Sequence, residues 1–288
     1  MSNELNLSLK ENQDMEIPEM IDHYRIIRLI LESYASVVCF GFQTDTMLKC
    51  AIKFIPIQYF EQKPDQIDIL RMVKHDHIIN IIDFFQYPKF VAMVMPYAIK
   101  DLFDYVVYDG PISEHITCRI IHDLLEAVNY LHSNNIWHCN ITPEQVLIKE
   151  DTIDGPFIQL SGFQSAKHVN SQEITGPAPG LVNYAAYELL DFNGNLVTLK
   201  RNATYSNKID IWSVGIIMFI LLTRKTSFDI QSQKGIESMK SGEIPLDDLD
   251  GHVSDCAIDL IRNMLQFDPD ERFSAAQALA HPWFNQMH

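Results

Sequence analysis

The hydrophobic pattern changes its period once along the chain, near residue 100. Before that point it consists mostly of short runs rich in Val, Ile and aromatic residues, at 25–31, 36–42, 47–55 and 90–95. These runs predict β-strands. One helix is predicted among them, because Ile67, Leu70 and Val73 follow Pro64 at helical spacing. Beyond Asp101 the helical period dominates, so we predict an α+β fold with a small β-rich lobe and a larger α-helical lobe.

Several segments of the second lobe depart from simple amphipathic helices. Short strands are expected at 146–148 and 157–160, followed by a loop over 164–181 that Gly and Pro interrupt. The longest apolar run, 211–222, is well short of the approximately 20 residues that cross a bilayer. It therefore predicts a buried helix, and no membrane association is expected.

Charge and cysteine content restrict the function classes. The formal net charge of -16 repels polyphosphate, so nucleic acid is not an expected partner. The five cysteines have no close pair, which favours reduced thiols over disulfides or a zinc site. Residues 1–20 lack the basic start and apolar stretch of a secretory signal. We therefore expect an intracellular protein, with the cytoplasm favoured and the nucleus left open.

Eight sequence strings, in one order and at consistent spacing, together resemble the protein kinase family and especially its calcium/calmodulin-dependent group. The strings are 50–53 (CAIK), 93–97 (MVMPY), 130–132 with 138–147 (YLH and HCNITPEQVL), 160–164 (LSGFQ), 184–188 (YAAYE), 210–215 (DIWSVG), 268–272 (DPDER) and 281–284 (HPWF). The resemblance covers 24–284 and implies a two-lobed protein-kinase-like fold. It divides the chain into a flexible tail at 1–22 and a kinase-like domain at 23–288, with an N-lobe at 23–97 and a C-lobe at 98–288.

The resemblance also implies that groups needed for phosphoryl transfer are missing. Asn140 stands where the family has its aspartate base, and general-base assistance is worth on the order of 10² to 10⁴ in rate. Gln145 and Gly162 stand at the two positions that hold magnesium, which prefers carboxylate oxygens. Cys139 and Thr142 replace an arginine and a lysine of the same loop. No catalytic residue and no metal ligand are predicted, so the expectation is that the chain is not an enzyme.

The first lobe keeps only part of the family's phosphate-binding set. Lys53 is retained, but its helix partner is the neutral Gln66, and Asp68 lies two residues on and therefore on another face. The family's glycine positions fall at bulky or charged residues, namely Ile30, Glu32 and Ala35. Side chains there hinder close backbone approach to phosphate.

An apolar slot for a nucleotide base is nevertheless expected from the resemblance. The predicted cofactor-binding residues are Lys53, Val37, Ala51, Met95, Ala98, Asp101 and Leu147. ATP or ADP without magnesium would be the ligand, and no cofactor is required. Plain core packing explains the same apolar residues equally well, so both interpretations stay open.

The family's structural framework is retained around these losses. His138, Phe163 and Asp210 have suitable types for stacking and anchoring, and Glu188 and Arg272 are expected to form a buried pair. This combination favours a pseudokinase that acts as a scaffold or allosteric regulator through a protein partner, for example an active kinase. Two alternatives remain: a metal-independent ATP or ADP sensor, and a divergent serine/threonine protein kinase with residual ATP-dependent activity.

Overall fold

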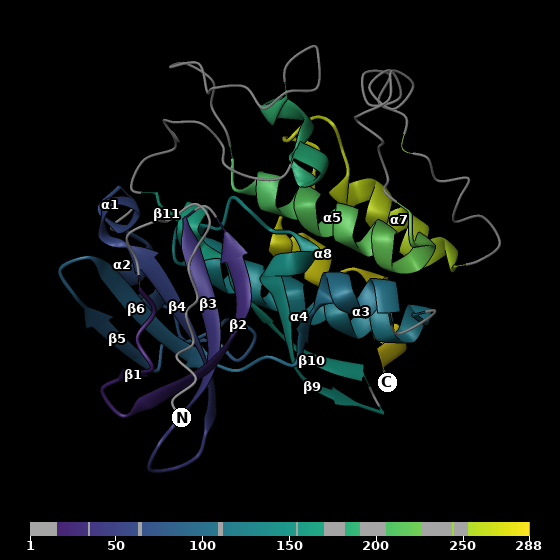
Figure 1. Cartoon of the computed structure of the whole chain (residues 1–288). Coiled ribbons are helices and arrows are strands. Elements are labelled where there is room, and N and C mark those ends of the chain that lie inside the picture. The colour runs from purple at the N-terminus through teal and green to yellow at the C-terminus, as the bar shows by residue number, and fades with distance from the viewer. Residues whose placement is uncertain are drawn as a thin grey trace. The chain divides into compact units, whose positions relative to one another are not determined.

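A computed structural model describes residues 16–33, 35–62, 65–108, 112–153, 155–169, 182–190, 206–225, 244 and 253–287. The chain divides into two compact units (Figure 1). The first comprises residues 1–74 and 79–98, and the second comprises residues 75–78 and 99–288.

The first unit is built on a six-stranded antiparallel sheet with the order β1-β2-β3-β4-β6-β5. Its strands are β1 (Met20–Ile21), β2 (Tyr24–Ser33), β3 (Ser36–Gln43), β4 (Lys49–Pro56), β5 (Asp83–Gln86) and β6 (Phe90–Pro96), and its helices are α1 (Ile57–Phe60) and α2 (Asp65–Met72). All four predicted strands and the predicted helix are present. Contrary to the prediction of a flexible tail at 1–22, Met20 and Ile21 form β1, and Ile21 is buried.

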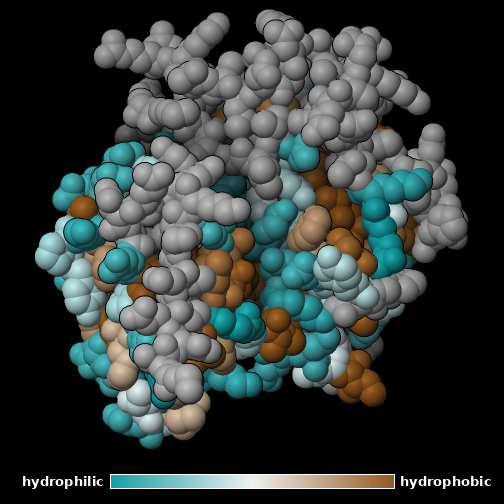
Figure 2. All heavy atoms as spheres, in the orientation of Figure 1, coloured by the Kyte–Doolittle hydropathy of each residue, from teal (hydrophilic) through white to brown (hydrophobic). Residues whose placement is uncertain are grey.

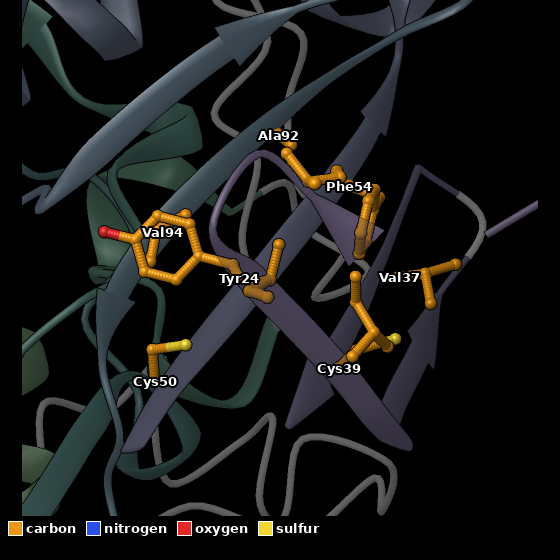
Figure 3. Packing of buried hydrophobic residues seen from close by; sticks show 10 residues of the cluster. Tyr24, Val37, Cys39, Cys50, Phe54, Ala92 and Val94 are labelled. Carbon is orange, nitrogen blue, oxygen red and sulfur yellow. The ribbon is translucent and has the colours of Figure 1, made fainter. Parts of the chain in front are cut away.

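Alternation of side chains gives this sheet two different faces. One face carries a core cluster that includes Tyr24, Val37, Cys39, Phe54 and Val94 (Figure 3). The other face carries a second cluster in which Ile55, Val91 and Met93 of the sheet pack with Ile67 of α2. Each face of the sheet therefore has its own core cluster, whereas most of β2 is exposed.

The second unit is mainly helical. Its helices are α3 (Leu102–Tyr108), α4 (Glu114–Ser133), α5 (Lys208–Thr223), α7 (Asp255–Met264) and α8 (Ala275–Leu279), and its strands are β7 (Lys100–Asp101), β8 (Ile136–Trp137), β9 (Val146–Thr152), β10 (Gly155–Leu160) and β11 (Lys167–His168). Short 3-10 helices are η1 (Pro143–Gln145), η2 (Phe163–Ser165), η3 (Val182–Tyr184), η4 (Tyr187–Leu189) and η6 (Pro282–Met287).

Two helices form the centre of this unit for reasons visible in their sequences. Helix α4 begins at Ser113, whose Oγ accepts a hydrogen bond from the Ile116 amide, and its apolar residues line one buried face. Helix α5 is buried on nearly all sides, as its apolar run predicted. Helices α7 and α8 begin in the same way, at Ser254 and Ser274.

The predicted α+β fold, with a small β-rich unit and a larger, mainly helical unit, is confirmed. Within the described residues no helix is long and apolar enough to cross a membrane. Hydrophobic and hydrophilic residues are interspersed over the described part of the face drawn in Figure 2. Most of the predicted loop at 164–181 lies outside the described residues.

Candidate active site

One buried carboxylate fixes the backbone of the loop that contains Asn140. Asp210 of α5 accepts hydrogen bonds from the His138 and Cys139 amides, at 2.9 and 2.8 Å, and from His132 Nε2 at 2.9 Å. Burial acts to raise the pKa of Asp210, but hydrogen bonding and charge from His132 outweigh burial and lower that pKa. The loop is therefore held by a charged acceptor, which makes stronger hydrogen bonds than a neutral one. Cys139 takes the left-handed φ of 63° in this arrangement.

His138 links this loop to the segment that contains Gly162. Its Nε2 atom lies 2.7 Å from the Ser161 carbonyl oxygen, and its Nδ1 atom accepts a hydrogen bond from the Asn140 amide at 3.3 Å. The ring also packs edge-on against Phe163, with 4.9 Å between the centroids. These contacts require a neutral ring with the proton on Nε2. Two backbone segments 23 residues apart are thereby joined.

The buried His138 ring gives a prediction for pH dependence. Burial lowers the pKa of His138 from its ordinary value of about 6.5. Below about pH 6.5 the unfolded chain binds a proton at this histidine, whereas the folded chain does not. The stability that His138 contributes above about pH 6.5 is therefore lost as the pH falls below that value. We expect the difference in unfolding free energy between wild type and His138→Gln to shrink from pH 7.5 to pH 5, as measured by urea unfolding. A difference that grows in acid would contradict this account.

Gln145 and Gly162 lie against each other. The Ser161 amide and Ser161 Oγ both donate to the Gln145 carbonyl oxygen, at 2.7 and 3.0 Å. Gly162 has φ 84° and ψ 33°, and a Cβ atom added there would lie 2.1 Å from Gln145 Oε1. The Gln145 side chain therefore occupies the space in which a side chain at 162 would begin.

Protein kinases use magnesium together with ATP. Whether this ion fits here depends on Gln145 and Gly162. At the family's metal positions the chain offers one neutral amide and a glycine with no side-chain donor. Mg²⁺ takes carboxylate oxygens in near-ideal octahedral geometry. The residues present do not fit this ion. Among the described residues, no group of three His, Cys, Asp or Glu side chains is placed to hold a metal.

The remaining side chains of the loop are neutral apart from Glu144. Asn140 is half-buried and Thr142 is buried. Oxygen Oε2 of Glu144 is buried without a hydrogen-bond partner among the described residues. The negative charge of Glu144 contributes to the raised pKa values of Asp101 and Tyr184, although burial is the larger cause for both. Glu144 is thus the carboxylate that the loop retains.

Lys53 shares a face of the first unit's sheet with Ala51 and Met95. Ala51 and Met95 are opposite each other in the β4–β6 ladder, and Lys53 is two residues from Ala51. On β3 the residue opposite Lys53 is Val38. Directly opposite residues of an antiparallel pair point to the same face, so Val38 joins this set.

Val37 lies on the other face of the sheet, contrary to the sequence-based assignment. It is opposite Phe54 and fully buried in the cluster with Cys39 (Figure 3). Because side chains alternate along a strand, one residue of register separates the two faces. The same shift moves the family's glycine positions from Ile30, Glu32 and Ala35 to Leu31, Ser33 and Ser36. Ser33 and Ser36 close the β2–β3 hairpin, where Ser33 Oγ accepts a hydrogen bond from the Ser36 amide.

The other predicted cofactor residues have the following places. Ala98 follows β6 in the first unit and is half-buried. In the second unit Asp101 and Leu147 are opposite each other in the β7–β9 ladder. The Asp101 carboxylate accepts a hydrogen bond from the Asp104 amide at 2.8 Å, so it caps the start of α3. Its part in ligand binding stays a prediction.

Gln66, the predicted helix partner of Lys53, lies on α2. Gln66 is buried, whereas Asp68 is exposed, which agrees with their assignment to different faces of the helix. Val38 and Ser161 were missed by the sequence analysis. Val38 could not be distinguished from Val37 in sequence, because its face depends on the β3–β4 register. Ser161 is an ordinary serine in sequence and gave no signal.

Comparison with known proteins gives one family. The family profile described as "Protein kinase domain" matches residues 24–284. Relatives include "Serine/threonine-protein kinase cds1" of Schizosaccharomyces pombe, 30% identical over 96% of this chain and 61% of the relative. The "Phosphorylase b kinase gamma catalytic chain, liver/testis isoform" of Bos taurus is 32% identical over 82% and 60%. The "Probable serine/threonine-protein kinase fhkD" of Dictyostelium discoideum is 30% identical over 93% and 37%.

These relatives contradict the prediction that the chain is not an enzyme. Proteins about 30% identical carry the names of serine/threonine kinases or of a kinase catalytic chain. The prediction gave too much weight to the missing base. Phosphoryl transfer depends mainly on positioning and electrostatic stabilisation, so loss of a base reduces the rate by a limited factor. The chain spans about 37% to 61% of the length of these three relatives.

Proposed function

Because the chain belongs to the protein kinase family, we propose that it is a divergent serine/threonine protein kinase with low ATP-dependent activity. The observation that carries this proposal is the ordered loop in which Asp210 holds the His138 and Cys139 amides and His138 holds Ser161. Such preorganised positioning supplies much of the rate enhancement in phosphoryl transfer. The protein substrate, a protein partner and a cytoplasmic location stay predictions.

The proposed reaction transfers the γ-phosphoryl group of ATP to a serine or threonine hydroxyl. The bond between the γ-phosphorus and the oxygen that bridges it to the β-phosphate breaks, and a bond from the hydroxyl oxygen to the γ-phosphorus forms. ADP leaves with the bridging oxygen, and the hydroxyl proton passes to water. Asn140 accepts a hydrogen bond from the hydroxyl and orients it, but its neutral amide takes no proton.

The residues present predict that the proposed reaction is slow. Without a carboxylate at Asn140, the rate loses the factor of about 10² to 10⁴ that a general base supplies. Lys53 provides the cation for phosphate in this proposal, because it stands in the family's lysine motif on β4. Water is the first candidate to take the hydroxyl proton. Glu144 is the second, because it is the carboxylate of the loop and its Oε2 atom has no hydrogen-bond partner among the described residues.

We expect the purified protein to transfer ³²P from labelled ATP to itself or to α-casein. Lys53→Met should reduce the rate by at least about tenfold, since it removes the phosphate-binding charge. Asn140→Asp should raise the rate by about 10²-fold, because it restores a base. The measurement is phosphoserine and phosphothreonine formed per unit time, identified by mass spectrometry.

A matched control is available on the same strand. Lys49 of β4 is exposed, so Lys49→Met changes the charge equally and should leave the rate unaltered. Glu144→Gln tests the second candidate for proton transfer. Transfer by the wild type that does not exceed the Lys53→Met background would reject the proposed function.

A further inference from the structure

The Gln145 side chain and the absence of a side chain at Gly162 are complementary. A Cβ atom at 162 would lie 2.1, 2.5 and 2.8 Å from Oε1, Cδ and Cγ of Gln145. All three distances are shorter than a Cβ atom tolerates, so the outer half of Gln145 fills this space. The two hydrogen bonds from Ser161 to the Gln145 carbonyl oxygen fix the two backbones at this separation.

This complementarity changes how the two substitutions are understood. Each one taken alone removes a ligand for Mg²⁺. Taken together, they place an amide where the family has a carboxylate. The Gln145 side chain reaches into the volume that a side chain at 162 would need. An amide can present N–H groups, which donate directly to phosphate oxygens, whereas a carboxylate contacts phosphate only through a cation.

We infer that this site binds the phosphates of a nucleoside triphosphate without a divalent cation, with the Gln145 amide donating directly to a phosphate oxygen. The inference rests on the proposed function, which supplies ATP as the ligand. Neutral donors replace a divalent charge here, so the affinity for ATP is expected to be modest. It should not depend on magnesium.

The first experiment measures ATP binding to the whole wild-type protein by isothermal titration calorimetry, once with excess MgCl₂ and once with excess EDTA. The two dissociation constants are expected to agree within about threefold. ATP binding that is at least about tenfold tighter with MgCl₂ overturns the inference and leaves the proposed function standing. Absence of ATP binding in both conditions rejects the proposed function itself, and the inference with it.

The second experiment converts the site. Gly162→Asp combined with Gln145→Asn restores a carboxylate and shortens the amide that blocks it. This double variant is expected to bind ATP at least about tenfold more tightly with MgCl₂ than with EDTA. Gly162→Asp alone should show a smaller gain from MgCl₂, because Gln145 still occupies the space. Equal gains in the single and double variants would show that Gln145 does not block the position.

The third experiment tests the complementarity through stability and needs no ligand. Gly155 also has a positive φ, 115°, but a Cβ atom there would come no closer than 3.7 Å to Ile116. Gly155→Ala therefore reports backbone strain alone. Gly162→Ala should lower the melting temperature further, and the additional loss should largely disappear in a Gln145→Ala background. Equal losses for both glycines in both backgrounds would contradict the complementarity.

Discussion

Replacing Arg272 with methionine is expected to lower the unfolding free energy of the second unit by about 3 to 5 kcal/mol. The guanidinium is completely buried and donates to both carboxylate oxygens of Glu188, at 2.8 and 2.9 Å. It also donates to the carbonyl oxygens of Gln266 and Lys208. Methionine preserves most of the side-chain volume but removes the Arg272 donors from all four acceptor oxygens. The unpaired Glu188 carboxylate accounts for most of the expected loss.

The chain is well suited to this measurement. Its three tryptophans, Trp137, Trp212 and Trp283, all belong to the second unit, so tryptophan fluorescence during urea unfolding follows that unit alone. Arg262→Met is the control, because Arg262 is exposed on α7 and its loss should cost less than about 0.5 kcal/mol.

The Arg272 prediction also has an internal test. Adding Glu188→Leu to Arg272→Met removes the unpaired charge, so the double variant should be more stable than Arg272→Met alone. A double variant that is less stable than the single one would show that the charge pair is not the source of the loss.

The fold could be predicted largely because its signals are local. Strand alternation and helix period depend on neighbours in sequence, and the motif strings fix the order of the elements. The elements that were missed are short. Strand β5 has four residues, and α3 has seven residues with five aromatic or Val side chains that resemble a strand in sequence.

The assignment of single residues to the site was less secure, for reasons of geometry. The sequence has no glycine at the β2–β3 turn from which positions along β3 could be numbered. Val37 was therefore chosen in place of Val38. A slip of one residue exchanges the two faces of a strand. By contrast, Gln66 and Asp68 were correctly assigned to different faces of α2, because this helix follows an unambiguous helical period.

The relation between Gln145 and Gly162 lay outside what the sequence could give. The sequence analysis interpreted each residue separately, as standing at a magnesium position of the family, and 17 positions separate them. Their contact depends on Ser161, which brings the two backbones together and has no recognisable motif role. Only the three-dimensional structure shows that the Gln145 side chain occupies the space next to Gly162.

Asp210→Asn is expected to lower the unfolding free energy by about 3 kcal/mol at pH 7, because hydrogen bonds to a charged acceptor are worth about 1.5 to 3 kcal/mol each. Asparagine keeps only one acceptor oxygen, and its NH₂ group then faces other donors. In one orientation the NH₂ group faces the Cys139 amide, and in the other it faces His132 and the His138 amide. The same change releases the strained Cys139 backbone. The proposed phosphotransfer activity should therefore fall along with the stability.

The pH dependence separates the loss of charge at Asp210 from a general loss of packing. The pKa of Asp210 is lowered in the folded protein, so its stabilisation is present above the ordinary carboxyl range and is lost as the pH falls through the lower folded value. Wild type and Asp210→Asn should thus differ at pH 7 and converge only in acid below about pH 4. Asp255→Asn, an exposed change at the start of α7, is the control and should cost at most about 1 kcal/mol. If hydrogen exchange at the His138 and Cys139 amides is as slow in Asp210→Asn as in wild type, the carboxylate does not hold the loop.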